Sequence, residues 1–167
     1  MVFLALFSEE TATDYLRDRL GPRYEAACQK CVHHAQKSAF FRYCYLLIHG
    51  GMWLDADLAL RQSPAPLFTH PMPFFHQRRR IHSLLANWLM IAAPGDSVID
   101  EIVAISLRNI EDTAFFERHA AARNIPAISG FHVVRRVAAQ RLHSVFKNTP
   151  AAPTPIGVID ETVHDAI

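Results

Sequence analysis

The chain has 167 residues, enough for one domain with a sizeable hydrophobic core. Half of the residues are hydrophobic and a fifth are charged, as in ordinary globular proteins. The formal net charge of +1 argues against binding nucleic acid through bulk positive charge. No apolar run reaches the length of a membrane span, and residues 1–7 are too short for the apolar region of a signal peptide. A cytoplasmic protein is expected, and peripheral contact with a membrane stays open.

The first part of the chain is predicted to be one strand and two helices. Residues 1–7 are apolar throughout, which is typical of a strand in the centre of a sheet. Helices are expected over about 11–20 and 24–34, because Gly21 and Pro22 break the helical pattern between them.

The cysteines number three, and an odd number argues against a disulfide framework. Cys28 and Cys31 have the spacing of half a zinc site, and His33 and His34 follow, but no second cysteine pair completes such a site. Cysteines three residues apart also share one face of a helix, so core positions are expected for them.

The most informative stretch of the sequence, which we call the organising stretch, runs from residue 37 to residue 60. A helix is predicted over 38–48, because apolar residues recur there at helical spacing. Gly50 and Gly51 stop this helix and turn the backbone into a short apolar strand. The strand ends on Asp55 and Asp57, which would leave the same face of the sheet in extended backbone.

The two carboxylates define a candidate cation site. At a separation of about 6–7 Å and an effective dielectric near 20, they would repel each other by roughly 2–3 kcal/mol, and a divalent cation would remove that repulsion. Arg42, on the preceding helix, could direct a positive charge at the same point. An alternative stays open in which Asp55 and Asp57 cap a turn and Arg42 pairs with one of them.

The remaining elements alternate between strands and helices. Strands are expected at 74–76, 81–85 and 87–93, and helices at 96–109, 113–123 and 131–146. Residues 1–149 would then form one α/β domain, in which ligands bind at the carboxyl ends of the strands. Residues 150–167 contain several prolines and are expected to be a stiff linker and a tail.

The organising stretch resembles a known family. Its residues are Lys37-Ser38-Ala39-Phe40-Phe41-Arg42-Tyr43 and Gly50-Gly51-Met52-Trp53-Leu54-Asp55-Ala56-Asp57. This pattern resembles the DXD-motif glycosyltransferases, which include fungal mannosyltransferases, capsular polysaccharide synthesis proteins and the glucosyltransferase domains of large bacterial toxins. The predicted strand at 87–93, with Pro94 and Gly95 after it, extends the resemblance.

The resemblance implies a GT-A-like nucleotide-diphospho-sugar transferase fold, with a central, mostly parallel sheet flanked by helices. Members usually begin with a strand and a helix that hold the nucleotide base, and residues 1–7 look like the second strand of the family. The first strand–helix unit would then be lacking, or a partner chain would complete the nucleotide site. A second departure is Ala39, which stands where the family usually has an aspartate that contacts the donor sugar.

The resemblance also implies roles for individual residues. Asp55 and Asp57 would be the catalytic carboxylates, with Asp57 bound directly to Mn²⁺ or Mg²⁺ and Asp55 bound to sugar or ribose hydroxyls, or to the metal through water. Arg42 would contact the donor sugar or its phosphates, and Asn87 could line the donor site. His132 is a further candidate metal ligand, because many such transferases have one near the carboxy-terminal end.

The predicted function is therefore that of a metal-dependent glycosyltransferase. It would move a sugar, with retention of configuration, from a nucleotide-diphospho-sugar to a saccharide, lipid-linked or protein acceptor in polysaccharide or glycoconjugate biosynthesis. Trp53 is expected only to pack in the core.

Two alternatives remain open. Ala39 and the short front of the chain favour a non-catalytic relic or a binding subunit of such a transferase. A haloacid-dehalogenase-type phosphohydrolase, with Asp55 as nucleophile, also places D-x-D after an apolar strand. That class usually has Thr or Val where this chain has Ala59, and it gives Arg42 no role.

Overall fold

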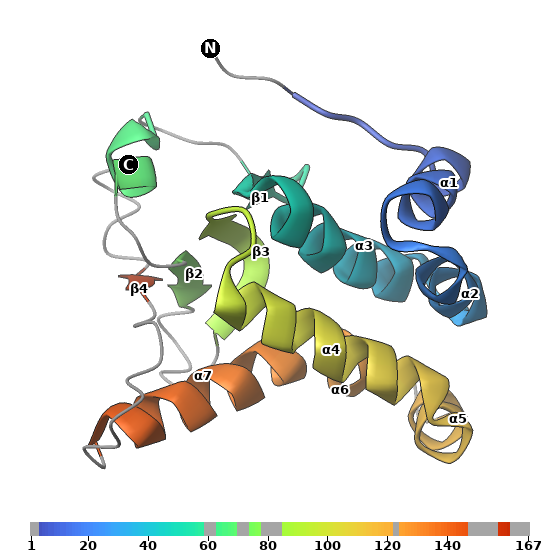
Figure 1. Cartoon of the computed structure of the whole chain (residues 1–167). Coiled ribbons are helices and arrows are strands. Elements are labelled where there is room, and N and C mark those ends of the chain that lie inside the picture. The colour runs from blue at the N-terminus through green and yellow to red at the C-terminus, as the bar shows by residue number, and fades with distance from the viewer. Residues whose placement is uncertain are drawn as a thin grey trace.

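The computed structural model describes residues 4–58, 63–69, 74–77, 85–121, 124–146 and 157–160. The protein is a mixed α/β structure that is mostly helical, with a small sheet at one side (Figure 1). The elements in chain order are α1 (Glu9–Leu20), α2 (Pro22–Lys30), α3 (His34–His49), β1 (Gly51–Leu54), the 3₁₀ turn η1 (Ala65–Thr69), β2 (Phe74–Gln77), β3 (Leu85–Ala92), α4 (Ser97–Glu111), α5 (Thr113–Ala121), α6 (Ile125–Ile128), α7 (Phe131–Phe146) and β4 (Gly157–Asp160).

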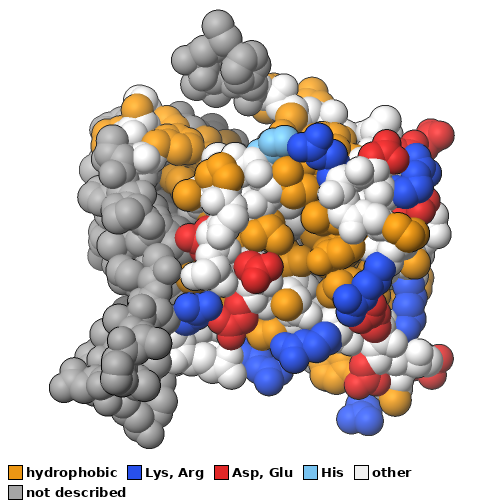
Figure 2. All heavy atoms as spheres, in the orientation of Figure 1, with side chains coloured by type: hydrophobic (Ala, Val, Ile, Leu, Met, Phe, Trp, Pro, Cys, Tyr) orange, Lys and Arg blue, Asp and Glu red, His pale blue; other side chains and the backbone are white. Residues whose placement is uncertain are grey.

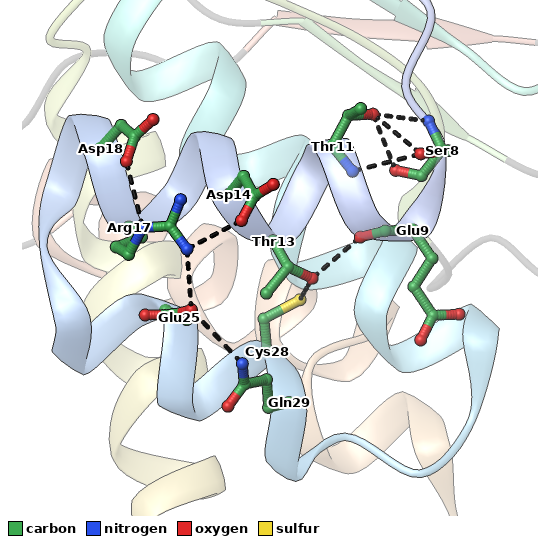
Figure 3. Close-up of polar contacts among 10 residues, drawn as sticks. All are labelled: Ser8, Glu9, Thr11, Thr13, Asp14, Arg17, Asp18, Glu25, Cys28 and Gln29. Atoms are coloured by element: carbon green, nitrogen blue, oxygen red, sulfur yellow. Dashed lines mark hydrogen bonds and ion pairs between the residues drawn. The ribbon is translucent and has the colours of Figure 1, made fainter.

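The first two helices form a pair that the local sequence determines. Ser8 caps α1, since its hydroxyl accepts the N–H of Thr11 at 3.1 Å while its own N–H donates to the Thr11 hydroxyl at 2.8 Å (Figure 3). Gly21 ends α1 with φ at 97°, and Pro22 occupies the first turn of α2. Figure 3 also shows Arg17 of α1 reaching Glu25 of α2, at 3.4 Å.

The strand predicted over residues 1–7 is wrong for residues 4–7. These residues have no strand pairing, and the side chains of Leu4 and Leu6 are 84% and 83% exposed. Of this segment, Phe7 packs against the rings of Tyr15 and Phe41. Apolar composition alone was a poor guide here, because a strand also needs a neighbour for its backbone hydrogen bonds, and none of the described strands lies beside this segment.

The turn between α3 and β1 confirms the predicted glycine stop. Gly50 and Gly51 have φ of 64° and 96°, values that side-chain-bearing residues rarely adopt. A Cβ on Gly50 would lie 2.6 Å from Pro94, so the glycine is also needed for the close approach of the β3–α4 turn. The N–H of Gly95 donates to the carbonyl of Leu47 at 2.8 Å and fastens the two turns together.

The sheet has the strand order β1-β3-β2-β4 in the described part of the chain. Both β1 and β2 are antiparallel to β3, and only β4 is parallel to its neighbour β2. The expected mostly parallel sheet is therefore wrong. A parallel pair needs a crossover connection, usually a helix, and no α-helix is described between β1 and β3.

The core lies between the sheet, α3 and α4. Phe40, Tyr43 and Leu46 of α3 are buried against Ile99 and Ile102 of α4, and these two helices lie side by side in Figure 1. The predicted helices at 96–109, 113–123 and 131–146 correspond to α4, α5 and α7, although residues 122 and 123 lie outside the described residues.

The face of the molecule drawn in Figure 2 is mixed in charge. Figure 2 shows acidic and basic side chains spread over the viewed face around an apolar centre. None of the described helices is both long enough and apolar enough to cross a bilayer. Residues 81–84 of the strand predicted at 81–85 lie outside the described residues.

Candidate functional site

Arg42 is the buried centre of the candidate site. It lies in the middle of α3, and its side chain is only 8% exposed. Its Nε and Nη2 groups donate to the carbonyl and hydroxyl of Ser38 at 3.4 and 3.2 Å, and Nη1 donates to the carbonyl of Asn87 on β3. Burial lowers the pKa of Arg42 and the nearby Asp55 raises it, but a guanidinium remains charged at any physiological pH.

Asp55 is the first residue after β1 and pairs with Arg42. Its Oδ1 lies 3.0 Å from Arg42 Nη1 and accepts the indole N–H of Trp53 at 2.7 Å. In the described part of the chain, no hydrogen bond or ion pair reaches its Oδ2, and the side chain is 32% exposed. The carboxylate is therefore anchored through one oxygen and open through the other.

The backbone at Asp57 differs from the expected extended strand. The carbonyl of Asp55 accepts the N–H of Leu58 at 3.0 Å, which closes a turn through Ala56 and Asp57. The spacing worked out for extended backbone therefore does not apply. The pairing of Arg42 with one of the acids, which the alternative interpretation required, is present.

Asp57 itself is exposed in this turn. Among the described residues it has no hydrogen-bond or ion-pair partner, so its carboxylate is available to a ligand or to an ion in solvent.

Asn87 completes the polar side of the site. Its amide group donates to the hydroxyl of Tyr43 at 2.8 Å, and its carbonyl accepts from Arg42. Burial raises the pKa of Tyr43 to about 12, so this hydroxyl stays neutral. Asn87 thus links α3 to β3 through both its backbone and its side chain.

These side chains border a cleft of about 220 Å³. Its lining includes Ala35, Ala39, Arg42, Asp55 and Asn87 on one side and Ile125, Pro126, Gly130 and Phe131 on the other. The second wall is formed by α6 and the start of α7, and the sequence analysis did not assign it to the site. Gly130 contributes to this wall because a Cβ there would lie 2.6 Å from Pro126, so the glycine permits a close approach of the two backbones.

A larger hollow of about 410 Å³ lies at the other end of the molecule, between α1, α2 and the start of α3. Its lining includes Glu9, Glu10, Asp14 and Glu25, and its lysine, Lys37, is paired with Glu9. These carboxylates would repel a phosphate-bearing ligand, so the smaller cleft beside the cation of Arg42 is the better candidate for a binding site.

No group of three or more histidine, cysteine or acidic side chains that could hold a metal ion occurs among the described residues. Asp55 and Asp57 nevertheless offer open carboxylate oxygens, and these suit Mg²⁺ or Mn²⁺ when waters and phosphates complete the coordination. His132 is exposed and is absent from the described lining of the cleft, and burial and Arg135 lower its pKa.

The cysteines are buried and free, as expected for core positions. Burial raises the pKa of Cys31 to about 12 and raises that of Cys28 as well. Protonated, buried thiols are poor metal ligands and poor nucleophiles, so they are not candidates for catalysis.

Comparison with known proteins agrees with the motif. Residues 3–73 match the family described as glycosyltransferase sugar-binding region containing DXD motif. The chain is also similar to the uncharacterized glycosyltransferase L373 of Acanthamoeba polyphaga mimivirus, at 30% identity over 92 residues. That match covers 53% of this chain and 36% of the viral protein, so the chain spans about a third of the relative's length. No solved structure matches the chain significantly. Residues 3–73, with Arg42, Asp55 and Asp57 among them, are therefore similar to the sugar-binding region of DXD-motif glycosyltransferases.

Proposed function

We propose that this protein is a metal-dependent glycosyltransferase that takes its sugar from a nucleotide-diphospho-sugar. The observation that carries this proposal is the anchored pair of Arg42 and Asp55 at the edge of a cleft, inside the family's DXD region. The family match favours sugar transfer over phosphohydrolase chemistry.

The anchored pair can recognise sugar hydroxyls. Arg42 has five N–H groups, and four of them have partners in the described residues. One N–H on Nη2 is left without a partner in the described residues, and Oδ2 of Asp55 is open as well. A hydroxyl group both accepts and donates, so this donor and this acceptor would suit the hydroxyls of a sugar. Asn87 lines the same cleft and is the third polar group that we assign to the donor.

The cleft has room for a sugar rather than for a whole sugar nucleotide. Pockets that bury drug-sized ligands occupy roughly 300–1,000 Å³, and this cleft measures about 220 Å³. We therefore assign the transferred sugar to the cleft, and the nucleotide to the side on which the exposed Asp57 lies. A partner chain could contribute to the nucleotide site there.

Asp57, with Asp55, would hold Mn²⁺ or Mg²⁺. The cation would neutralise the charge that develops on the departing diphosphate. The residues of the chain orient the sugar against that leaving group: Arg42 and Asp55 fix its hydroxyls, and the wall at Phe131 keeps water from one side of the ring. Transfer with retention, to a saccharide, lipid-linked or protein acceptor in polysaccharide or glycoconjugate assembly, follows from the resemblance.

Calorimetry with UDP- and GDP-sugars, with and without Mn²⁺, tests the proposal. We expect binding that requires the metal and is lost in Asp57→Asn. Asp100→Asn is the matched control, because Asp100 is also exposed but lies on α4. Absent binding, metal-independent binding, or equal effects of the two substitutions would refute the proposal.

A binding subunit without catalytic activity is the second candidate. Ala39 favours it, because this buried side chain lines the cleft and offers the sugar no polar group. Metal-dependent donor binding without transfer to any acceptor, and without slow hydrolysis of the donor, would identify a binding subunit.

A further inference from the structure

We infer that Trp53 is a positioning residue, which holds Asp55 and Arg42 in the one arrangement that can receive the donor sugar. This inference rests on the proposed function. The sequence analysis expected this tryptophan only to fill the core, and the structure gives it two further contacts.

The first contact is a hydrogen bond to the carboxylate. The indole N–H of Trp53 donates to Oδ1 of Asp55 at 2.7 Å, across a separation of two residues along the chain. The same oxygen lies 3.0 Å from Nη1 of Arg42, so two donors converge on Oδ1. A carboxylate held by one donor can swing about that contact, whereas two donors from different directions fix its plane.

The second contact is with the cation. Cζ of Arg42 lies 4.8 Å from the centroid of the Trp53 ring, within the range of a cation–π interaction. Arg42 is thereby held by hydrogen bonds to Ser38 and Asn87 and by its contact with the face of the indole ring. The single N–H that remains for a ligand has a defined direction as a result.

The indole is itself well placed to act as a support. Trp53 stands opposite Met90 in the β1–β3 ladder, and its ring packs against the core cluster that contains Met90. A side chain packed in a strand loses little further freedom when it makes a hydrogen bond. The open oxygen of Asp55 is therefore oriented by the sheet, through Trp53, before any ligand arrives.

A purely structural role would need only the ring. Phenylalanine in place of Trp53 would keep an aromatic side chain in the strand and a weaker cation–π contact, but it would remove the N–H. Substitution by 3-benzothienylalanine, in which sulfur replaces the N–H, removes the donor and preserves the shape of the ring system. These two variants separate positioning from packing.

The control is Trp88→Phe. Trp88 is half-buried on the neighbouring strand β3, and its backbone carbonyl, which a substitution retains, accepts the N–H of Asp55. Both substitutions replace tryptophan with phenylalanine in the same small sheet, but only Trp53→Phe removes a donor to the Asp55 side chain.

The experiment measures donor binding by calorimetry and the kinetics of transfer or donor hydrolysis, at saturating Mn²⁺. We expect Trp53→Phe and the benzothienyl variant to weaken donor binding roughly tenfold, as for a lost hydrogen bond to a charged group. The change should lie mainly in Kd or KM if Asp55 orients the bound sugar in the ground state. Trp88→Phe should change binding less than twofold.

The outcomes distinguish the inference from the function on which it rests. If the unsubstituted protein fails to bind any donor in Mn²⁺, both are overturned. If it binds and the benzothienyl variant binds equally well, the proposed function stands and the positioning role is refuted. Equal losses in Trp53→Phe and Trp88→Phe, with the benzothienyl variant unaffected, would also refute it, because packing alone would then explain both losses.

Discussion

Replacing Arg42 with methionine is the sharpest test of the electrostatic arrangement at the site. Methionine keeps much of the side-chain length and fits a helix, so the change removes mainly the guanidinium. The lost groups are an ion pair with Asp55 and hydrogen bonds to Ser38 and Asn87.

The magnitude follows from burial. Breaking a fully buried ion pair costs about 3–5 kcal/mol, because an unpaired charge is left behind. Asp55 is 32% exposed and can recover water, so we discount its share. The carbonyl of Asn87 loses a donor and adds about 1 kcal/mol. We expect Arg42→Met to lower the free energy of unfolding by about 3 kcal/mol in total.

The assay is urea and thermal denaturation followed by circular dichroism, with Asp55→Asn and the double variant measured beside it. For a chain of this length a loss of about 3 kcal/mol lowers the melting temperature by roughly 6–12 °C. Since the pair is direct, the double variant should lose about 1–2 kcal/mol less than the sum of the single variants. A loss below about 0.5 kcal/mol, or strict additivity, would refute the conclusion that the pair is formed and buried.

Three further predictions concern the surroundings of the site. Gly50→Ala should destabilise the protein by about 2–4 kcal/mol in thermal melts, because its Cβ would meet Pro94 at a positive φ, whereas Gly21→Ala, with open space around it, should cost less. The thiols should react with Ellman's reagent at pH 8 only as fast as the protein unfolds, because burial raises their pKa values, to about 12 for Cys31; an immediate reaction would contradict this. Ala39→Asp should tighten donor binding severalfold and cost about 1–3 kcal/mol of stability, since it adds a carboxylate at a position only 3% exposed; unchanged binding would show that the missing aspartate is not what limits the donor site.

The parts of the fold that local chemistry determines were predictable from the sequence. Helical spacing and a glycine pair located the end of α3 and the start of β1, and Pro94 and Gly95 located the turn between β3 and α4. Glycine there supplies the positive φ that the turns require, and proline ends the strand, so the sequence pattern has a single interpretation.

The rest depends on partners far apart in the sequence. The ion pair between Arg42 and Asp55 depends on how the end of β1 lies against α3, and the motif left open whether this pair forms. The cleft wall at Pro126 and Phe131 depends on how α6 docks against α3 and how α7 docks against α4 and β3, which no local pattern encodes. The antiparallel sheet likewise depends on how the chain returns from β1 to β3.

The positions of the polar side chains at the site depend on the close contact between the backbone turns at Gly50 and Pro94. Arg42 lies about two helical turns before Gly50 on α3, and Asn87 lies on β3, the strand that leads to Pro94. A shift of the junction between Gly50 and Pro94 would therefore displace both side chains together. Substitutions at the junction could therefore lower donor affinity in a protein that still folds, although they touch no ligand. In directed evolution of donor preference, substitutions at the junction of these two turns would change the geometry of the cleft while leaving its polar side chains in place.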